Sequence, residues 1–596
     1  MADELPNSQI ADALEELGDL YELDGAIVHR VLAYRSGARA VREAPVSVAG
    51  LAREGRATEL AGIGETLQEK ILALSETGTI PAREKLRAKV PPGLIAITRL
   101  PGVGPKRVRL LHSALGVDSL DALREAALAG KLRTVKGLSA KFEASVLDSL
   151  ERGAAERSAP RLLLPKALEL GRALADGLTE RGGAGTEVLI AGSARRMADS
   201  VKDVDLIAVT RKPVALAKSL AALPEVESVA SAGKAGARGR SHSGFSIDLR
   251  IAKPAQLGNL LQHFTGSGAH NAALREAAVR RGLHVSEYGI YDDATGTTTT
   301  CASEQEVYGL LGLAYIEPEL RENRGELAAA ALGSGGSDPP RPTDAAHTGL
   351  PELISLSDIK GDLHCHTVAS DGRNTIEEMA LAARERGYEY VAITDHSASH
   401  GFGNDVSPEQ LRSQIERVRE VDASIQGIRV LAGSEVNIMP DGSLDYEDDL
   451  LAELDWVIAS AHTAFGMSEQ AMTERMIAAV EHPLVDAIGH PTGRLIERRA
   501  PYALDVQALI EAAVRTGTML EINANPDRRD LNDIHARAAA RAGASILIDS
   551  DAHWIERFDV MRWGVATARR AWLSAEDVAN TRSWEEFAKL RKKTRK

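Results

Sequence analysis

The chain has 596 residues, of which 44% are hydrophobic and 26% charged, the composition expected of a soluble protein with several domains. Its two cysteines, Cys301 and Cys365, exclude a disulfide scaffold and an all-cysteine zinc site, and they predict a protein of the reducing cytoplasm. The lack of a long apolar run predicts that no helix spans a membrane. The net charge of -14 falls entirely on residues 333–596, which hold 29 Lys and Arg against 43 Asp and Glu, whereas residues 1–332 hold 42 of each.

Helices are predicted up to about Ser158, and two segments among them share one pattern. LAGIGETLQEKI (60–71) and LPGVGPKRVRLL (100–111) each have a Gly-x-Gly turn followed by a helix with apolar spacing. One such turn could be a simple corner between helices, but two copies favour helix-hairpin-helix motifs that bind DNA phosphates through free N–H groups. A weaker third copy, TVKGLSAKFEASV (134–146), lacks one glycine. The glycines of the two full copies are Gly62, Gly64, Gly102 and Gly104.

Strand-like runs follow at EVLIAG (187–192), VDLIAVT (204–210) and FSIDLRI (245–251). Asp203 and Asp205 are two residues apart, so their carboxylates share one face of a strand, and Asp248 lies in the third run. Asp-x-Asp alone is common on exposed strands. Three carboxylates on neighbouring strands are typical of a two-Mg²⁺ (or Mn²⁺) site for nucleotidyl transfer.

The turn after the first of these runs carries groups suited to phosphate. Gly192 and Ser193 can approach a triphosphate through backbone N–H and hydroxyl groups. Arg195 and Arg196 add cationic donors. The turn therefore supports the interpretation of the carboxylates as a nucleotidyl-transfer site.

The segment Gly333–Gly349 reads GSGGSDPPRPTDAAHTG and predicts a flexible linker, because it has almost no apolar residues. After it, short apolar runs alternate with amphipathic helices, and most end in polar residues: YVAITD, IRVLAGSEV, WVIASAH, VDAIGH, TMLEIN and SILIDSD. This alternation predicts β-α units that close into a parallel barrel, with chemistry at the carboxyl ends of the strands.

Metal-ligand residue types gather at the ends of these runs and in DLHCHTVASDG. A single histidine is more often a core or surface residue, but this set favours a metal site at the mouth of one barrel. Imidazole and carboxylate without thiolate suit Mn²⁺, Zn²⁺ or Fe²⁺. The residues are His364, His366, Asp371, His396, Glu435, His462, His490, Asp551 and His553.

Residues 1–330 resemble the family X DNA polymerases, the family of DNA polymerase beta. The N-terminal domain resembles the lyase domain of that family: Lys70 falls at the Schiff-base lysine position, and Thr66 occupies the motif's other lysine position. HRVLAYR (29–35) resembles the 5′-phosphate pocket, which the resemblance assigns to His29, Arg30 and Tyr34.

A further segment, HFTGSGAHNAALREAAVRRGLHVSEY (263–288), resembles the family's nucleotide-selecting segment, with His263 where the family usually has tyrosine. The resemblance implies that Phe264 and Gly266 line the sugar of the incoming dNTP. It also implies that Asn271 reaches the minor-groove edge and that Arg275 senses the template strand.

The second half resembles the PHP (polymerase and histidinol phosphatase) domain, a distorted β/α barrel with a metal cluster that hydrolyses phosphoesters. All nine ligand positions of the active type are filled, which implies up to three Mn²⁺, Zn²⁺ or Fe²⁺ ions. The expected fold is multidomain α/β. Its expected parts are a lyase-like domain (1–90), a second helix-hairpin-helix domain (91–158), a nucleotidyltransferase palm with a mixed sheet (159–255), a thumb-like nucleotide-selecting subdomain (256–332), a linker (333–355) and the PHP barrel (356–596).

These features favour a monomeric, bacterial-type family X DNA polymerase that uses dNTPs to fill gaps in duplex DNA during repair. The PHP site would act as a 3′→5′ exonuclease or phosphoesterase on 3′ ends, with cleavage at abasic sites as a further activity. One alternative is a PHP phosphoesterase for small molecules, tethered to DNA by a silent polymerase half. Another is a scaffold that only binds DNA ends, which would not need either metal constellation.

Overall fold

The computed structural model describes residues 5–98, 100, 102–151, 161–331, 349–399 and 405–592, so most of the predicted linker lies outside the described residues. The chain divides into two compact units. The first comprises Met1–Leu162, Lys166–Ile190 and Lys202–Lys253, and the second comprises Leu163–Pro165, Ala191–Val201 and Pro254–Lys596. No helix within the described ranges is long and apolar enough to span a membrane.

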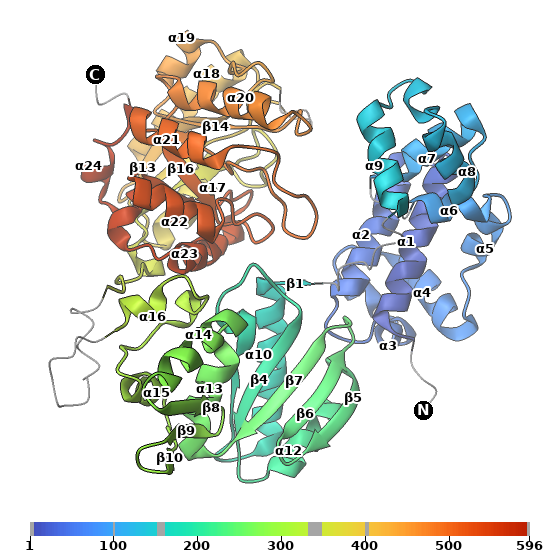
Figure 1. Ribbon diagram of the computed structural model, residues 1–596. Helices are drawn as coiled ribbons and strands as arrows, with labels where there is room; N and C mark the ends of the chain where they lie inside the picture. The colour runs from blue at the N-terminus through green and yellow to red at the C-terminus, as the bar shows by residue number, and fades with distance from the viewer. Residues whose placement is uncertain are drawn as a thin grey trace. The chain divides into compact units, whose positions relative to one another are not determined.

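Within the described residues, the first unit begins with nine α-helices around one aliphatic core, drawn from blue to cyan in Figure 1. The core needs few aromatic rings because Leu, Ile, Val and Ala from every helix fill it. The helices are α1 (Asn7–Leu23), α2 (Val28–Glu43), α3 (Val48–Arg53), α4 (Glu65–Thr77), α5 (Pro81–Arg87), α6 (Pro92–Thr98), α7 (Pro105–Leu115), α8 (Leu120–Leu128) and α9 (Ala140–Glu151).

A five-stranded mixed sheet completes the first unit, with strand order β2-β4-β7-β6-β5. β4 runs parallel to β7, whereas β2 pairs with β4, and β6 with β7 and β5, in antiparallel fashion. Helix α10 (Leu164–Gly182) packs its Gly171 against Ile190 and Val204 on one face. The strands are β2 (Glu187–Ile190), β4 (Asp203–Val209), β5 (Val226–Gly233), β6 (Gly236–Ser241) and β7 (Ser246–Ala252), and α12 (Pro213–Ser219) packs against β5 and β6.

The second unit contains a small α/β subdomain before the barrel. Its three-stranded antiparallel sheet has the order β10-β9-β8. Buried Leu, Val, Ile and Tyr side chains form its own core. The elements are α11 (Gly192–Arg195), β3 (Ser200–Val201), α13 (Leu257–Thr265), α14 (Gly268–Val279), β8 (Leu283–Ser286), β9 (Gly289–Asp292), β10 (Thr297–Thr299), α15 (Glu304–Leu310) and α16 (Glu326–Ala329).

Seven parallel strands, β11 to β17 in chain order, form the barrel of the second unit. The end of β17 returns to β11, where Cys365 and Ala552 form a parallel bridge. The strands are buried on both faces, which explains their continuous apolar sequences. They are β11 (Gly361–Cys365), β12 (Tyr390–Ile393), β13 (Arg429–Asn437), β14 (Trp456–Ser460), β15 (Ala487–Ile488), β16 (Met519–Asn523) and β17 (Ile546–Asp549).

Helices alternate with these strands along the chain and cover the barrel, drawn from yellow to red in Figure 1. They are α17 (Ile376–Glu385), α18 (Pro408–Ser424), α19 (Asp448–Glu453), α20 (Glu469–Glu481), α21 (Val506–Thr516), α22 (Asp533–Ala542), α23 (Met561–Arg570) and α24 (Trp584–Phe587). The predicted classes of fold are thus confirmed: a helical N-terminal part, a mixed-sheet palm and a distorted β/α barrel.

Candidate active sites

Three carboxylates lie on two adjacent inner strands of the mixed sheet, β4 and β7. On β4, Val204, Leu206 and their alternate neighbours face the core, so Asp203 and Asp205 share the opposite face. Asp205 is directly in register with Asp248 on the adjacent parallel strand β7. The structure therefore brings together the three aspartates that the sequence singles out as metal ligands.

Two arginines neutralise Asp248 in this arrangement. Arg250, two residues along β7, pairs with it at 2.8 Å, and Arg238, opposite it on β6, pairs at 3.4 Å. Asp248 and both arginines line an open cavity of about 240 Å³. The cavity provides space for a charged ligand beside the carboxylates. Although the chain as a whole has a net charge of -14, Arg238 and Arg250 bring positive charge to this place.

The Gly-Ser-Ala-Arg-Arg turn forms the short helix α11 in the second unit. Gly192 has a φ of 64°, which favours glycine, and precedes Ser193 at the start of the turn. Arg195 pairs with Glu304 at 2.6 Å, and Arg196 pairs with Glu322 at 2.9 Å. Both cations that were expected to bind phosphate are thus held by carboxylates of the α/β subdomain.

The predicted nucleotide-selecting segment (263–288) runs from the end of α13 through α14 and β8, and it begins with the turn between the two helices. Asn271 closes it, because its Nδ2 donates to the carbonyl oxygens of His263 and Gly266. A Cβ at Gly266 would lie 2.5 Å from Oδ1 of Asn271, so the close approach requires glycine. Phe264 is half-buried with its ring edge against His263, and Arg275 is exposed on α14.

The two predicted helix-hairpin-helix turns have the same local geometry. Gly62 and Gly102 adopt φ angles of 94° and 76°, in the left-handed region. Gly64 and Gly104 are the residues that precede α4 and α7, and no side chain caps either helix. The backbone N–H groups of Glu65 and Thr66 in α4, and of Lys106 in α7, are therefore available to an anion, whereas Pro105 has no N–H to offer.

The residues that resemble a 5′-phosphate pocket lie on α2. Tyr34 stacks on Tyr21 with ring centroids 5.2 Å apart, and the guanidinium of Arg30 lies over the same Tyr21 ring. His29 is exposed beside Arg30. Lys70 is half-buried on α4, where its Nζ contacts the carbonyl oxygen of Thr66.

The barrel brings its predicted ligands together from six of its strands or the segments after them. Eight of them fall into three groups whose ligand atoms lie within 4.8 Å of one another. The groups are His366, Asp371, His396 and His553; His364, His366 and Asp551; and His396, Glu435 and His462. The ninth, His490, contacts Oε1 of Glu435 at 2.9 Å through Nε2.

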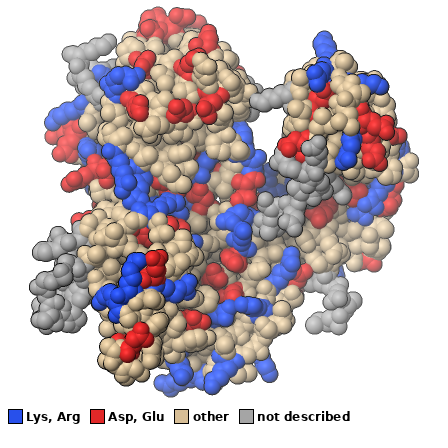
Figure 2. Space-filling view, viewed as in Figure 1, with Lys and Arg blue, Asp and Glu red and all other residues tan. Residues whose placement is uncertain are grey.

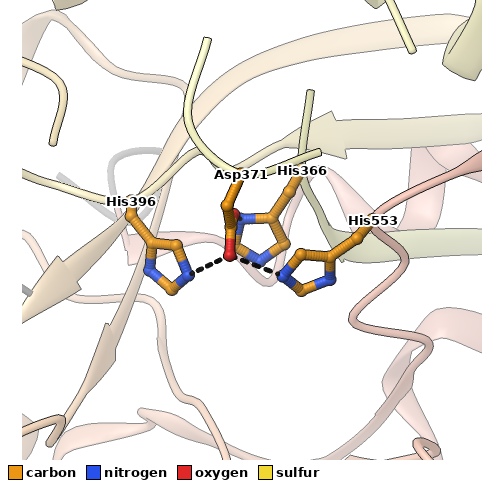
Figure 3. Close-up of side chains that lie close together, drawn as sticks. All are labelled: His366, Asp371, His396 and His553. Carbon is orange, nitrogen blue, oxygen red and sulfur yellow. Dashed lines mark hydrogen bonds and ion pairs between the residues drawn. The ribbon is translucent and has the colours of Figure 1, made fainter. Parts of the chain in front are cut away.

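The first group is shown in Figure 3, where three imidazoles surround Asp371. Oδ2 of Asp371 lies 3.2 Å from Nε2 of His553 and 3.7 Å from Nε2 of His396. Glu435 is shared in a similar way, with one oxygen 2.9 Å from Nδ1 of His396. His366 belongs to the first and second groups and His396 to the first and third, so these two histidines connect the three groups into one cluster.

The electrostatics of the cluster suit cations. Burial opposes the charge of Asp551, but the neighbouring His364, His366 and His553 outweigh it and hold its pKa well below the usual range. Burial and the imidazoles of His553 and His396 lower the pKa of His366 to about 4, which keeps it neutral and able to ligate.

Buried polar atoms in the cluster also lack hydrogen bonds. Nε2 of His364, Nε2 of His366 and Oε2 of Glu435 are buried and, among the described residues, make no hydrogen bond of good geometry, although each has an oppositely charged group within 4 Å. Buried polar atoms without a hydrogen bond destabilise the folded protein unless a ligand binds to them. The donor set of imidazoles and carboxylates therefore fits a multinuclear site for divalent cations.

Glu521, which the sequence analysis did not single out, supports two of these ligands. It is fully buried on β16, its Oε1 lies 2.6 Å from Nδ1 of His364, and its Oε2 accepts the backbone N–H of His490. The sequence did contain a signal for it, because Glu521 is a carboxylate inside the apolar run TMLEIN. A charge is rarely buried without a partner, so a charged residue in a buried strand indicates a partner in the protein interior.

On the face shown in Figure 2, acidic side chains gather over α19, while basic and acidic side chains are mixed over the rest of the face.

Parts of the chain match four known domain families. They are a helix-hairpin-helix domain (residues 5–80), a SAM-like helix-hairpin-helix tandem (94–152), the DNA polymerase beta thumb (260–322) and the PHP domain (362–525).

Curated relatives match both the whole chain and parts of it. Over 575 residues the chain is 37% identical to the DNA polymerase/3'-5' exonuclease PolX of Bacillus subtilis (strain 168), and the match covers 96% of each chain. It is 33% identical over 256 residues to a probable phosphatase of Thermoanaerobacter sp. (strain X514), which covers 39% of this chain and 96% of the relative. Similarity across nearly the whole of the first relative, with the thumb, helix-hairpin-helix and PHP matches, shows that the chain belongs to the family X DNA polymerases that carry a PHP domain.

Proposed function

We propose that this protein fills short gaps in DNA with dNTPs and processes 3′ ends with its barrel. The observation that carries the first activity is the register of Asp205 with Asp248, next to Asp203 on the same face. The observation that carries the second is the cluster of histidines and carboxylates with buried donor atoms that make no hydrogen bond of good geometry.

At the palm, Asp203, Asp205 and Asp248 would hold Mg²⁺ or Mn²⁺. These ions, when bound, activate the primer 3′-hydroxyl and stabilise the pyrophosphate that leaves. Gly192 and Ser193 bind the phosphates through N–H and hydroxyl groups, and Arg195 and Arg196 neutralise their charge. Phe264 and Gly266 line the sugar, while Asn271 and Arg275 contact the base-pair edge and the template.

DNA itself is held by the helix-hairpin-helix turns. The free N–H groups after Gly62-Ile63-Gly64 and Gly102-Val103-Gly104 bind backbone phosphates without regard to base sequence. His29, Arg30 and Tyr34 receive the 5′-phosphate of a gap. Lys70 is the candidate nucleophile for removing a 5′-deoxyribose phosphate.

In the barrel, the nine ligand residues would hold up to three Mn²⁺, Zn²⁺ or Fe²⁺ ions. Such ions, when bound, would lower the pKa of a water molecule and offset the negative charge of a phosphodiester. The ligand residues fix the positions of the cations, and the neutral His366 adds a donor without adding charge. The expected reaction is 3′→5′ removal of nucleotides, with abasic-site cleavage as a related activity. We place the protein in the cytoplasm as a monomer that acts in DNA repair.

The test is a primer assay on a one-nucleotide gap with a 5′-phosphate and a labelled 3′ end, run in Mn²⁺ with and without dNTPs. Extension with dNTPs and shortening without them would support both activities. Shortening alone would leave the polymerase half silent. Extension alone would remove the proposed exonuclease.

A second candidate for the barrel is hydrolysis of phosphate monoesters, favoured by the shorter relatives named as probable phosphatases. A 3′-phosphorylated primer and a small aryl phosphate separate the candidates. Release of phosphate from the aryl ester, without shortening of the primer, would favour the monoesterase.

A further inference from the structure

The turn after α11 is held by arginines of the barrel that belong to the same compact unit. The fully buried Arg529 donates from Nη1 to the carbonyl oxygen of Met197 at 3.0 Å. It also pairs with Asp199 at 3.1 Å, and Arg494 pairs with the other oxygen of Asp199 at 2.8 Å. Met197 has a φ of 56°, a conformation that a non-glycine residue keeps only when its surroundings enforce it.

A third barrel arginine, Arg570 on α23, contacts the turn at the predicted triphosphate-binding arginine. Its Nη1 donates to the carbonyl oxygen of Arg196 at 2.7 Å. The same Nη1 lies 3.0 Å from Oε1 of Glu322, and Nε of Arg196 lies 2.9 Å from that oxygen. Arg570 is fixed on its other side by Asp533 at 2.9 Å. Among the described residues, Arg570 and Arg196 thus share Glu322.

We propose that Arg570 is a positioning residue for nucleotide binding, because it neutralises Glu322 and so lets Arg196 turn to the triphosphate of the incoming dNTP. The inference rests on the proposed role of Arg196 in binding that triphosphate. If Arg570 has this role, the barrel contributes a residue to nucleotide binding by the polymerase in addition to its own metal site.

The physical argument is the cost of a buried charge without a counter-ion. The Glu322 side chain is only 17% exposed, and Arg570 is 8% exposed. If Arg196 leaves Glu322 for a triphosphate, Arg570 remains within 3.0 Å and keeps the carboxylate paired. Without Arg570, the same movement would leave a largely buried carboxylate unpaired, so Arg196 would stay with Glu322 and dNTP would bind more weakly.

The experiment measures KM for dNTP and kcat for filling a one-nucleotide gap, with the full chain. Arg570→Met is expected to raise the KM for dNTP roughly tenfold or more, with little change in kcat. The matched control is Arg569→Met. Arg569 is the next residue of α23 and pairs with Glu319 at 2.7 Å, so its loss also breaks an ion pair between the barrel and the α/β subdomain. It should leave KM within about twofold, since Arg569 pairs with Glu319 and not with the Glu322 that Arg570 and Arg196 share.

A double-mutant cycle isolates the charge. Glu322→Gln removes the carboxylate that must be neutralised, so it should leave or lower the KM for dNTP. Arg570→Met added to Glu322→Gln should then have little further effect on KM. Arg570→Met alone could lower the unfolding midpoint or the 3′-shortening activity of the barrel, and its effect on KM would then not be specific. In that case the comparison of the double variant with Glu322→Gln decides whether the charge of Glu322 is the cause.

Three results would overturn the inference. One is an equal rise of KM in Arg569→Met and Arg570→Met, which would make the effect a general loss of contact. Another is a tenfold rise in Glu322→Gln alone. The third is a KM for dNTP that rises in Arg196→Met but stays unchanged in Arg570→Met. This result would overturn the role of Arg570 and still support the proposed role of Arg196. If Arg196→Met itself leaves KM unchanged, the proposed role of Arg196 and this inference fail together.

Discussion

Oε1 of Glu521 lies 2.6 Å from Nδ1 of His364, and the other oxygen of the same carboxylate accepts the backbone N–H of His490. The contact to Nδ1 directs Nε2 of His364 into the cluster, where it lies 3.4 Å from Glu435. A carboxylate behind a ligating histidine fixes the orientation of the ring and makes it a better ligand. Glu521 therefore acts on the metal site through the residues that line it.

Glu521→Gln should weaken metal binding by about 10- to 100-fold, the usual effect of losing such a partner. The measurement is Mn²⁺ and Zn²⁺ content after dialysis against graded chelator. Extension of primers should be unaffected. The control is Glu511→Gln on α21, an exposed carboxylate whose recorded contact is with the amide of Gln507. Equal metal retention by both variants would contradict this role for Glu521.

Asp248→Ala should reduce nucleotide addition at least about 100-fold, because it removes one of the three carboxylates expected to hold the cations. Shortening of the 3′ end in the absence of dNTPs should persist, since that activity belongs to the barrel. Both rates are measured on the same gapped substrate. Loss of both activities together would argue against two independent sites.

His366→Ala should have the reverse effect. His366 belongs to two of the three ligand groups, so its loss removes a donor from each. We expect 3′ shortening to fall at least about 100-fold while extension with dNTPs stays near that of the unmodified protein. Shortening at the original rate would place the nuclease chemistry elsewhere in the chain.

Much of this architecture could be predicted because local patterns report it. The Asp203–Asp205 spacing places two carboxylates on one strand face whatever the rest of the fold does, and the register with Asp248 agrees with that. In the barrel, parallel strands open at the same end, so ligand-type residues after successive apolar runs meet there. His490, reached through the two-residue strand β15, also joins the cluster at Glu435.

What could not be predicted depends on pairs that are distant in the sequence. Glu521 is 157 residues from His364, and Arg570 is 374 residues from Arg196. No periodicity reports such a pair, and a single arginine on a helix is normally solvated. The sequence also suggested that Arg195 and Arg196 are open donors, whereas the structure pairs each with a carboxylate.

Binding to gapped DNA should weaken steeply with salt. Each phosphate contact contributes about -0.9 to the slope of log affinity against log salt, so two glycine turns predict a slope of about -2 or steeper. Gly62→Ala and Gly102→Ala should each make the slope shallower by about one contact, because a Cβ is strained at these φ angles. Gly55→Ala, at a φ of 72° outside both turns, is the control. An unchanged slope in all three would contradict the assignment of the turns.

Glu304 should make a stability contribution that depends on pH. It is buried between Arg195 at 2.6 Å and the fully buried Arg321. Burial opposes its charge, but the two guanidiniums outweigh this and hold its pKa below the usual value. A lowered pKa in the folded state means that the contribution is complete above the ordinary carboxyl pKa and is lost as pH falls through the folded-state pKa.

Glu304→Gln should therefore lower the unfolding midpoint at pH 7 by about 5 °C or more, since breaking a buried pair strands its cations. The difference from the unmodified protein should shrink as pH falls from the ordinary carboxyl value of about 4.3 through the lower folded-state pKa, where the native carboxylate also takes up a proton. Glu276→Gln, in an exposed pair with Arg280, should change the midpoint by about 1 °C or less. A loss of the same size at pH 3 and pH 7 would mean that shape rather than charge at Glu304 stabilises this part of the fold.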